Sequence, residues 1–182
     1  MVAKVFAITN QKGGVGKTTT SVNLAASLAA TRRRILLIDL DPQGNATMGS
    51  GISKNEIENT AYELLTKKAD LSEVIVRSEI GKYDVIPANG DLTAAEVELL
   101  NEIGREYRLK KVLAEVRDNY EFIIIDCPPS LNMLTVNALS AADGVLIPMQ
   151  CEYYALEGLV ALMGTVEQIR ETVNPNLEIS GI

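Results

Sequence analysis

The sequence predicts an α/β domain in which a mostly parallel sheet is flanked by helices. Strand-like and helix-like segments alternate along the chain, a pattern that calls for parallel strands joined by right-handed crossovers. Hydrophobic residues make up 47% of the 182 residues and aromatic residues only 4%, so the core must be built from Val, Ile, Leu and Ala. Such residues fill parallel strands that helices cover on both faces. A glycine-rich loop also lies between the first predicted strand and the first predicted helix.

In the first half of the chain, the residues near the start show the clearest pattern of strand and helix. Residues 2–9 alternate as a strand does and lead into the glycine-rich loop, and residues 18–30 form a helix rich in Ala and Leu. Residues 35–39 form a short apolar strand, and residues 84–87 are a further strand candidate. Residues 47–82 show no pattern that predicts an element.

The second half alternates between helices and strands. Helices are expected at residues 93–103, 107–119, 131–142 and 155–172. Asp91 or Thr93 is the expected N-cap of the first of these helices. Strands are expected at residues 122–126, 144–149 and 177–182. Because the last strand runs to the final residue with no helix to cover it, we expect residues 1–182 to be a single domain that is truncated at its C-terminus.

Charge and cysteine content limit the classes of function. A net charge of −7 argues against a surface that is basic all over, so any contact with nucleic acid would be a local patch. Arg32, Arg33 and Arg34 end a predicted helix, where cations favour the dipole, and a contact with DNA is the less favoured interpretation. Cys127 and Cys151 suit reduced thiols. With neither a signal peptide nor an apolar run of transmembrane length, the sequence predicts a cytoplasmic protein without membrane attachment.

The glycine-rich loop has the sequence QKGGVGKT at residues 11–18, between a strand and a helix. Gly13, Gly14 and Gly16 let backbone N–H groups approach phosphate oxygens, and the start of the helix adds its positive dipole end. Lys17 is placed to reach the β- and γ-phosphates, and the Thr18 hydroxyl to bind Mg²⁺. The alternative is a turn that only links strand to helix. The predicted nucleotide-binding residues are Lys12, Gly13, Gly14, Val15, Gly16, Lys17, Thr18 and Thr19.

Three carboxylates follow two of the predicted strands. Asp39 and Asp41 lie where a buried strand enters a turn, and ligands collect at the carboxyl ends of parallel strands. A carboxylate there can orient an attacking water or hold a metal-bound water, although either residue can instead form the turn before Pro42. Asp126 ends an apolar strand of Walker B form, whose carboxylate commonly holds Mg²⁺ through water. The predicted metal residues are Thr18, Asp39 and Asp126.

The loop departs from the common phosphate-loop pattern, which has Gly at the position of Gln11, and it carries an additional lysine, Lys12. The segment KGGVGKT resembles the deviant phosphate loop of the superfamily that contains ParA, MinD and the nitrogenase iron protein. The resemblance implies that Lys12 reaches across a dimer interface to the phosphates of the partner's nucleotide. The alternative is an ordinary solvated lysine.

Further segments resemble chromosome-partitioning ATPases of the ParA/Soj type, nearly end to end. DLDPQGN at residues 39–45 is similar to their first switch motif, which implies that Asp41 positions the hydrolytic water. CPPS at residues 127–130 is similar to their second switch, and residues 150–159 and 174–179 resemble the segments after their fifth strand. Those proteins continue well beyond this point, and the continuation supplies much of their adenine pocket and of their basic DNA-binding surface.

The resemblance implies a P-loop ATPase that works as an ATP-dependent dimerisation switch in chromosome or plasmid partitioning. Such a protein binds ATP or ADP with Mg²⁺ and hydrolyses ATP slowly, with stimulation by a ParB-type partner. Its dimer binds DNA nonspecifically in the full-length protein, which places it in the cytoplasm at the nucleoid. The catalytic residues expected from this resemblance are Asp41, Lys12 and Lys17.

Three other functions on the same scaffold stay open. A reductase like the iron protein would need cysteines that bridge two subunits through an iron–sulfur cluster, and neither Cys127 nor Cys151 looks placed for this. An amide-forming metabolic enzyme would need a pocket for an acid substrate. A MinD-like membrane ATPase attaches through an amphipathic C-terminal helix, which the sequence does not show.

Overall fold

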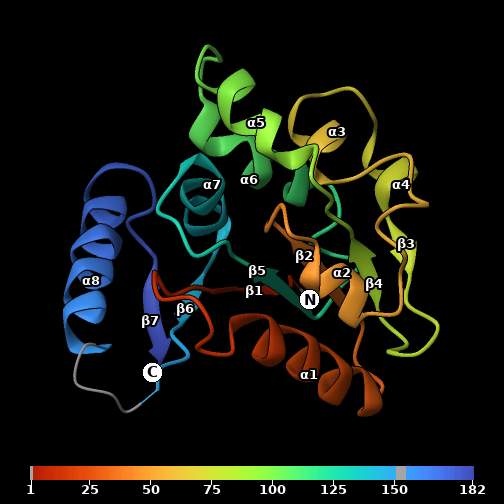
Figure 1. Cartoon of the computed structure of the whole chain (residues 1–182), viewed down its shortest axis with the longest axis horizontal. Coiled ribbons are helices and arrows are strands. Elements are labelled where there is room, and N and C mark those ends of the chain that lie inside the picture. The colour runs from red at the N-terminus through yellow and green to blue at the C-terminus, as the bar shows by residue number, and fades with distance from the viewer. Residues whose placement is uncertain (1, 151–154) are drawn as a thin grey trace.

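A computed structural model describes residues 2–150 and 155–182, except for the side chains of residues 155–157. The strands of this part of the chain form one sheet in the order β3-β4-β2-β5-β1-β6-β7 (Figure 1). Only β3 and β4 pair antiparallel, so the predicted mostly parallel sheet is confirmed. The strands are β1 Lys4–Ile8, β2 Ile35–Asp39, β3 Val76–Arg77, β4 Asp84–Ile86, β5 Phe122–Asp126, β6 Gly144–Leu146 and β7 Glu178–Gly181.

Helices cover both faces of the sheet, as Figure 1 shows, with α1 on one face and the larger group on the other. The side chains of β2 alternate between two cores: Leu36 and Ile38 pack on the side of α5 to α8, and Ile35 and Leu37 on the side of α1. This alternation follows from the period of a strand. The helices are α1 Lys17–Ala30, α2 Asn45–Gly49, α3 Ala61–Leu65, α4 Leu71–Val74, α5 Leu92–Leu99, α6 Arg108–Ala114, α7 Met133–Ala141 and α8 Ala155–Thr172, with a 3-10 turn, η1, at Arg105–Tyr107.

Several element boundaries differ from those that the sequence predicts. Residues 47–82, where no element was predicted, contain α3, α4, β3 and most of α2, all of them too short to show a periodic pattern. Helix α5 ends at Leu99, and the chain turns at Gly104, whose φ is 65°, into the 3-10 turn η1. Helix α6 ends at Ala114, where the N–H groups of Glu115 and Val116 bond to carbonyls three residues back.

The N-cap position of α5 is occupied by one of the two predicted residues. Asp91 occupies the N-cap position, but its side chain makes no capping hydrogen bond within the described part of the chain. Its backbone N–H instead donates to the Asn89 side chain, 3.0 Å away.

None of the helices formed by the described residues combines the length and apolar character needed to cross a membrane.

The sheet order brings three loops together at one edge. Strand β5 lies between β1 and β2, and Asp126 pairs in register with Ile8 of β1 and with Asp39 of β2. The loops that follow these three strands therefore start side by side at the carboxyl end of the sheet. They are the loops that carry the glycine-rich segment and the predicted carboxylates.

Candidate functional site

The glycine-rich loop is fixed at its start by a buried asparagine. The Asn10 side-chain oxygen accepts the N–H of Lys12 at 3.0 Å, and its amide nitrogen donates to the Pro148 carbonyl at 2.8 Å. The N–H of Thr9 bonds to the carbonyl of Leu146 at 3.1 Å. Asn10 therefore ties the loop to the end of β6. The sequence analysis missed this role, although a polar residue directly after a buried strand is a signal for it.

The loop itself is open on its inner face. Gly14 and Gly16 have φ values of 75° and 91°, in the left-handed region that glycine adopts without strain. A Cβ built on Gly13, Gly14 or Gly16 would meet no atom within 4 Å. The space beside these three glycines is therefore unfilled, as it must be for a group such as a phosphate to approach the backbone.

Lys17 begins α1 and lies almost completely buried beside this loop. Its ammonium donates to the Lys12 carbonyl at 3.1 Å, so the side chain folds back along the loop. Burial lowers the pKa of Lys17, and the nearby carboxylates of Asp126 and Asp41 partly oppose this. The nearby carboxylates thus favour the charged form of Lys17, and a charged ammonium with little water around it is suited to bind a phosphate.

Asp126, at the end of β5, is fully buried and receives two hydroxyl groups from α1. Thr18 Oγ1 donates to its Oδ2 and Ser21 Oγ to its Oδ1, each at 2.8 Å. Burial raises the pKa of Asp126 to about 6, although both hydrogen bonds favour the ionised form. The predicted pair of Thr18 and Asp126 is thus in direct contact. Ser21 was not predicted, but it lies one helical turn after Thr18 and so on the same face of α1.

Asp39 closes the turn that follows β2. Its Oδ2 accepts the N–H and the hydroxyl of Thr47, both at 2.8 Å, and its Oδ1 accepts the N–H of Asp41 at 3.1 Å. Burial and the neighbouring Asp126 raise the pKa of Asp39 to about 7. The metal-binding role of Asp39 stays a prediction, and the structure gives both of its carboxylate oxygens protein partners.

Asp41 lies two residues further on in the same turn and is also buried, with 9% of its surface exposed. Its Oδ1 accepts the N–H of Gln43 at 2.9 Å, so Asp41 also forms the turn that was the alternative interpretation. Gly44 has a φ of 64°, and a Cβ there would come within 2.6 Å of the Ala88 carbonyl, so only glycine fits. Lys54 donates to the Gln43 carbonyl at 2.6 Å. The position of Asp41 is therefore set by several local contacts.

The segment after β5 leads into α7. Cys127 is buried as a free thiol with a raised pKa, and its N–H bonds to the Ile8 carbonyl at 3.1 Å. Asn132 caps α7 by accepting the N–H groups of Leu134 and Thr135. The second cysteine, Cys151, and part of the segment 150–159 lie outside the described residues.

The described residues contain no group of three His, Cys, Asp or Glu side chains that could hold a metal ion. Mg²⁺ seldom needs such a cage, because it is usually held by one or two protein ligands, by water and by phosphate oxygens of the substrate. The contact between the Thr18 hydroxyl and the Asp126 carboxylate suits that mode of binding.

The fold and the open loop at the end of β1 define the class of protein as a P-loop AAA domain, and residues 3–179 match the AAA_31 family of AAA domains. The chain is 55% identical to Soj of Bacillus subtilis, over 100% of this chain and 72% of that protein. It is 54% identical to the chromosome partitioning protein ParA of Myxococcus xanthus, over 100% of this chain and 64% of that protein. The chain belongs to the Soj/ParA family.

Other relatives and solved structures agree on the fold. An uncharacterised protein of Pseudomonas putida is 63% identical over 100% of this chain and 69% of its own length. Cobyrinic acid a,c-diamide synthase from Mycobacterium smegmatis, with bound ADP and magnesium, superposes with a TM-score of 0.94 at 41% identity, over 97% of this chain and 72% of that one. A putative plasmid partition protein from Borrelia burgdorferi, bound to AMPPNP, superposes with a TM-score of 0.80 at 30% identity, over 93% of this chain and 72% of that one.

Proposed function

We propose that the chain is the nucleotide-binding part of an ATPase that partitions bacterial chromosomes or plasmids. The observation that carries the proposal is the open glycine loop with the buried Lys17 beside it and the contact between Thr18 and Asp126 at its end. The chromosome partitioning protein ParA among the relatives, and the nucleotides bound in structural neighbours, support it.

In this proposal residues 12–19 surround the phosphates of ATP or ADP. Backbone N–H groups of the loop donate to phosphate oxygens, and the Lys17 ammonium exchanges the Lys12 carbonyl for the β- and γ-phosphates. The Thr18 hydroxyl and the Asp126 carboxylate, which are in contact, would hold Mg²⁺, and Asp126 would orient that hydroxyl. Bound Mg²⁺ supplies positive charge to the phosphate oxygens that become more negative during transfer.

Hydrolysis is the in-line attack of water on the γ-phosphate, and positioning and electrostatics supply most of the rate. We assign Asp41 to the positioning of that water. Asp39 acts through its neighbour, because its carboxylate holds the Asp41 N–H and thereby the turn. Asp39 is thus a positioning residue, and its role as a metal residue beside Thr18 and Asp126 stays a prediction.

The assignment of Lys12 concerns a second copy of the chain. We place its ammonium on the phosphates of the partner's nucleotide, so that ATP with Mg²⁺ brings two chains together. A ParB-type partner then stimulates hydrolysis, and the full-length dimer binds DNA nonspecifically at the nucleoid in the cytoplasm. Membrane attachment has no part in this cycle.

The alternative of an amide-forming metabolic enzyme gains some support from the diamide synthase structure. Its identity with this chain, 41%, is lower than the 55% and 54% shared with Soj and ParA. We therefore favour partitioning.

A binding assay tests the nucleotide site. We expect Lys17→Ala to weaken the binding of labelled ATP strongly in equilibrium dialysis with Mg²⁺, because the buried ammonium is the main cation of the loop. Lys110→Ala, at an exposed position of α6, is the matched control and is expected to bind as the wild type does. Equal binding by Lys17→Ala and the wild type, with both proteins folded, would refute the assignment.

A further inference from the structure

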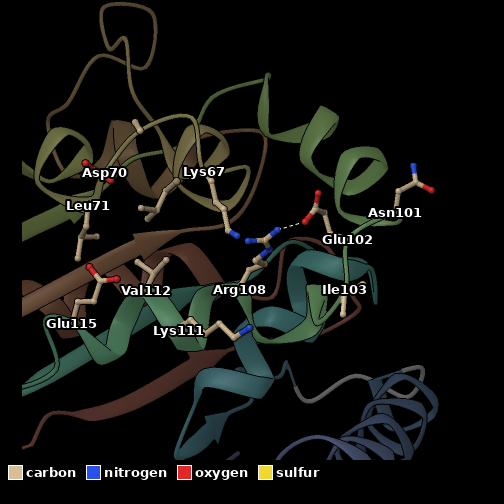
Figure 2. Close-up of a pocket in the computed structure, with 12 residues that line it drawn as sticks. Lys67, Asp70, Leu71, Asn101, Glu102, Ile103, Arg108, Lys111, Val112 and Glu115 are labelled. Atoms are coloured by element: carbon tan, nitrogen blue, oxygen red, sulfur yellow. Dashed lines mark hydrogen bonds and ion pairs between the residues drawn. The ribbon is translucent and has the colours of Figure 1, made fainter.

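A pocket of about 520 Å³ lies between the α3–α4 turn, the turn that follows α5, and helix α6 (Figure 2). Its lining comes entirely from residues 64–115, so it shares no residue with the proposed nucleotide site. Leu71 and Val112 form an apolar wall, and Lys67, Arg108 and Lys111 bring positive charge. The volume falls in the range typical of ligand-binding pockets.

Arg108 is the most unusual residue of the pocket. It is only 8% exposed, and its guanidinium forms an ion pair through Nη2 with Glu102, whose side chain is 51% exposed. The Nε of Arg108 is buried and has no hydrogen-bond partner among the described residues. A buried guanidinium with an unsatisfied N–H is unfavourable, and an additional acceptor would stabilise it. Glu102 lies in the exposed turn after α5 and can be displaced by a competing carboxylate.

The charges of the pocket are separated. In Figure 2 the ammonium of Lys67 and the guanidinium of Arg108 point into the same end, next to Glu102. Asp70 and Glu115 lie toward the opposite end, in the region of Leu71 and Val112. Lys67 forms no ion pair with any residue that the structure describes. One end of the pocket therefore favours an anion, with an apolar wall beside it.

Exposed apolar side chains border this cationic end. Ile103, which lines the pocket, is 98% exposed, and Val97 and Leu100 precede it at intervals of three residues and are also exposed. Exposed apolar residues grouped beside polar ones are typical of protein–protein contact sites. A free small anion would leave these side chains in water, whereas a peptide with apolar side chains would cover them.

We propose that this pocket binds an acidic peptide segment of a partner protein. A carboxylate of the peptide takes the place of Glu102 on Arg108 and also contacts Lys67. An apolar side chain next to that carboxylate packs on Ile103, at the border of the cationic end. Charge-assisted hydrogen bonds to a guanidinium supply the specificity, and burial of the apolar side chain adds affinity.

Two synthetic peptides test the proposal on the ¹⁵N-labelled chain by NMR titration. The first is acetyl-Leu-Glu-Leu-Glu-Leu-amide, and the second replaces both Glu residues with Gln. We expect the first peptide to shift the amide signals of Lys67, Arg108 and Val112 and to bind about tenfold more tightly than the second. Equal binding of the two peptides, or no shift at these residues, would overturn the proposal. So would binding of succinate or inorganic phosphate alone as tight as that of the first peptide, since the pocket would then be a small-anion site.

Variants of the pocket test whether the ion pair between Arg108 and Glu102 takes part in peptide binding or only stabilises the fold. Arg108→Gln risks misfolding because Arg108 is buried, so the test uses Lys67→Gln and Glu102→Gln. We expect Lys67→Gln to weaken binding of the acidic peptide, and Glu102→Gln to tighten it because the competing carboxylate is gone. Lys110→Gln, on the same helix α6 but outside the pocket lining, is the control. Unchanged or weaker binding by Glu102→Gln, or Lys67→Gln binding as tightly as the control, would contradict the model of competition.

Discussion

Three buried carboxylates at the end of the sheet differ in the groups that contact them. Asp126 binds two hydroxyl groups of α1, whereas Asp39 binds backbone N–H groups and one hydroxyl of its own turn. Asp41 uses one oxygen to close the turn at Gln43. From these contacts we infer a different role for each residue. Asp126 lies beside the proposed metal, Asp39 holds the turn, and Asp41 takes part in the proposed reaction.

The role of Asp41 predicts a separation of binding from hydrolysis. We expect Asp41→Ala to bind ATP as the wild type does but to hydrolyse it on the order of 10²-fold more slowly, because a positioned group that acts in the reaction is lost. Single-turnover measurements at saturating ATP and Mg²⁺ give the rate of the chemical step. A rate equal to that of the wild type would rule out this role.

Thr47 is predicted to stabilise the turn that carries Asp41. Its hydroxyl donates to Asp39 at 2.8 Å and accepts the N–H of Ala88 at 2.9 Å, all of them buried. We expect Thr47→Val to lower the free energy of unfolding by about 1–3 kcal/mol, because the Ala88 N–H loses its partner. Urea unfolding measures this, with Thr93→Val on the surface of α5 as the control. Equal stability of the two variants would argue against the role of Thr47.

At the scale of elements, two asparagines connect α7 to its neighbours: Asn132, the N-cap of α7, and Asn137 within the helix. The Asn132 amide donates to Glu96 of α5 at 2.6 Å. Asn137 is fully buried; it accepts the Leu109 N–H at 3.0 Å and donates to the Arg105 carbonyl at 2.9 Å. The helix that follows the proposed second switch is thereby connected to the segment around the α5–α6 pocket.

Asn137 is expected to matter more for stability than the cap residue. Asn137→Ala leaves a buried N–H and a buried carbonyl without their side-chain partners, so we expect a loss of about 2–4 kcal/mol. Asn132→Ala removes an N-cap, for which about 1 kcal/mol is typical. Chemical denaturation of both variants, followed by circular dichroism, compares them. A smaller loss for Asn137→Ala than for Asn132→Ala would contradict this account of the helix connections.

For the whole molecule, local sequence signals predicted the parallel sheet, the long helices and the loop at residues 12–19. They could not predict contacts between distant residues, such as Asn10 with Pro148, 138 positions apart, or Thr47 with Ala88, 41 positions apart. The short elements between residues 45 and 77 also lack a periodic pattern and form because tertiary packing holds them. The contact between Asp39 and Thr47 could not be predicted either, because Thr47 lies in a segment for which the sequence predicted no element.

The central claim is that ATP joins two chains and that Lys12 makes this possible. Two bound triphosphates that face each other repel, and a lysine from each chain offsets that repulsion at short range in an interface of low dielectric constant. Nucleotide binding by one chain should depend on Lys12 far less. Asp41→Ala, which is expected to retain ATP, provides the background in which dimers persist.

Sedimentation velocity of the Asp41→Ala chain with ATP and Mg²⁺, with and without Lys12→Ala, tests this claim most directly. We predict a dimer for Asp41→Ala and a monomer for the double variant, with similar ATP affinity for both in equilibrium dialysis. Dimers of the double variant as abundant as those of Asp41→Ala would contradict the account.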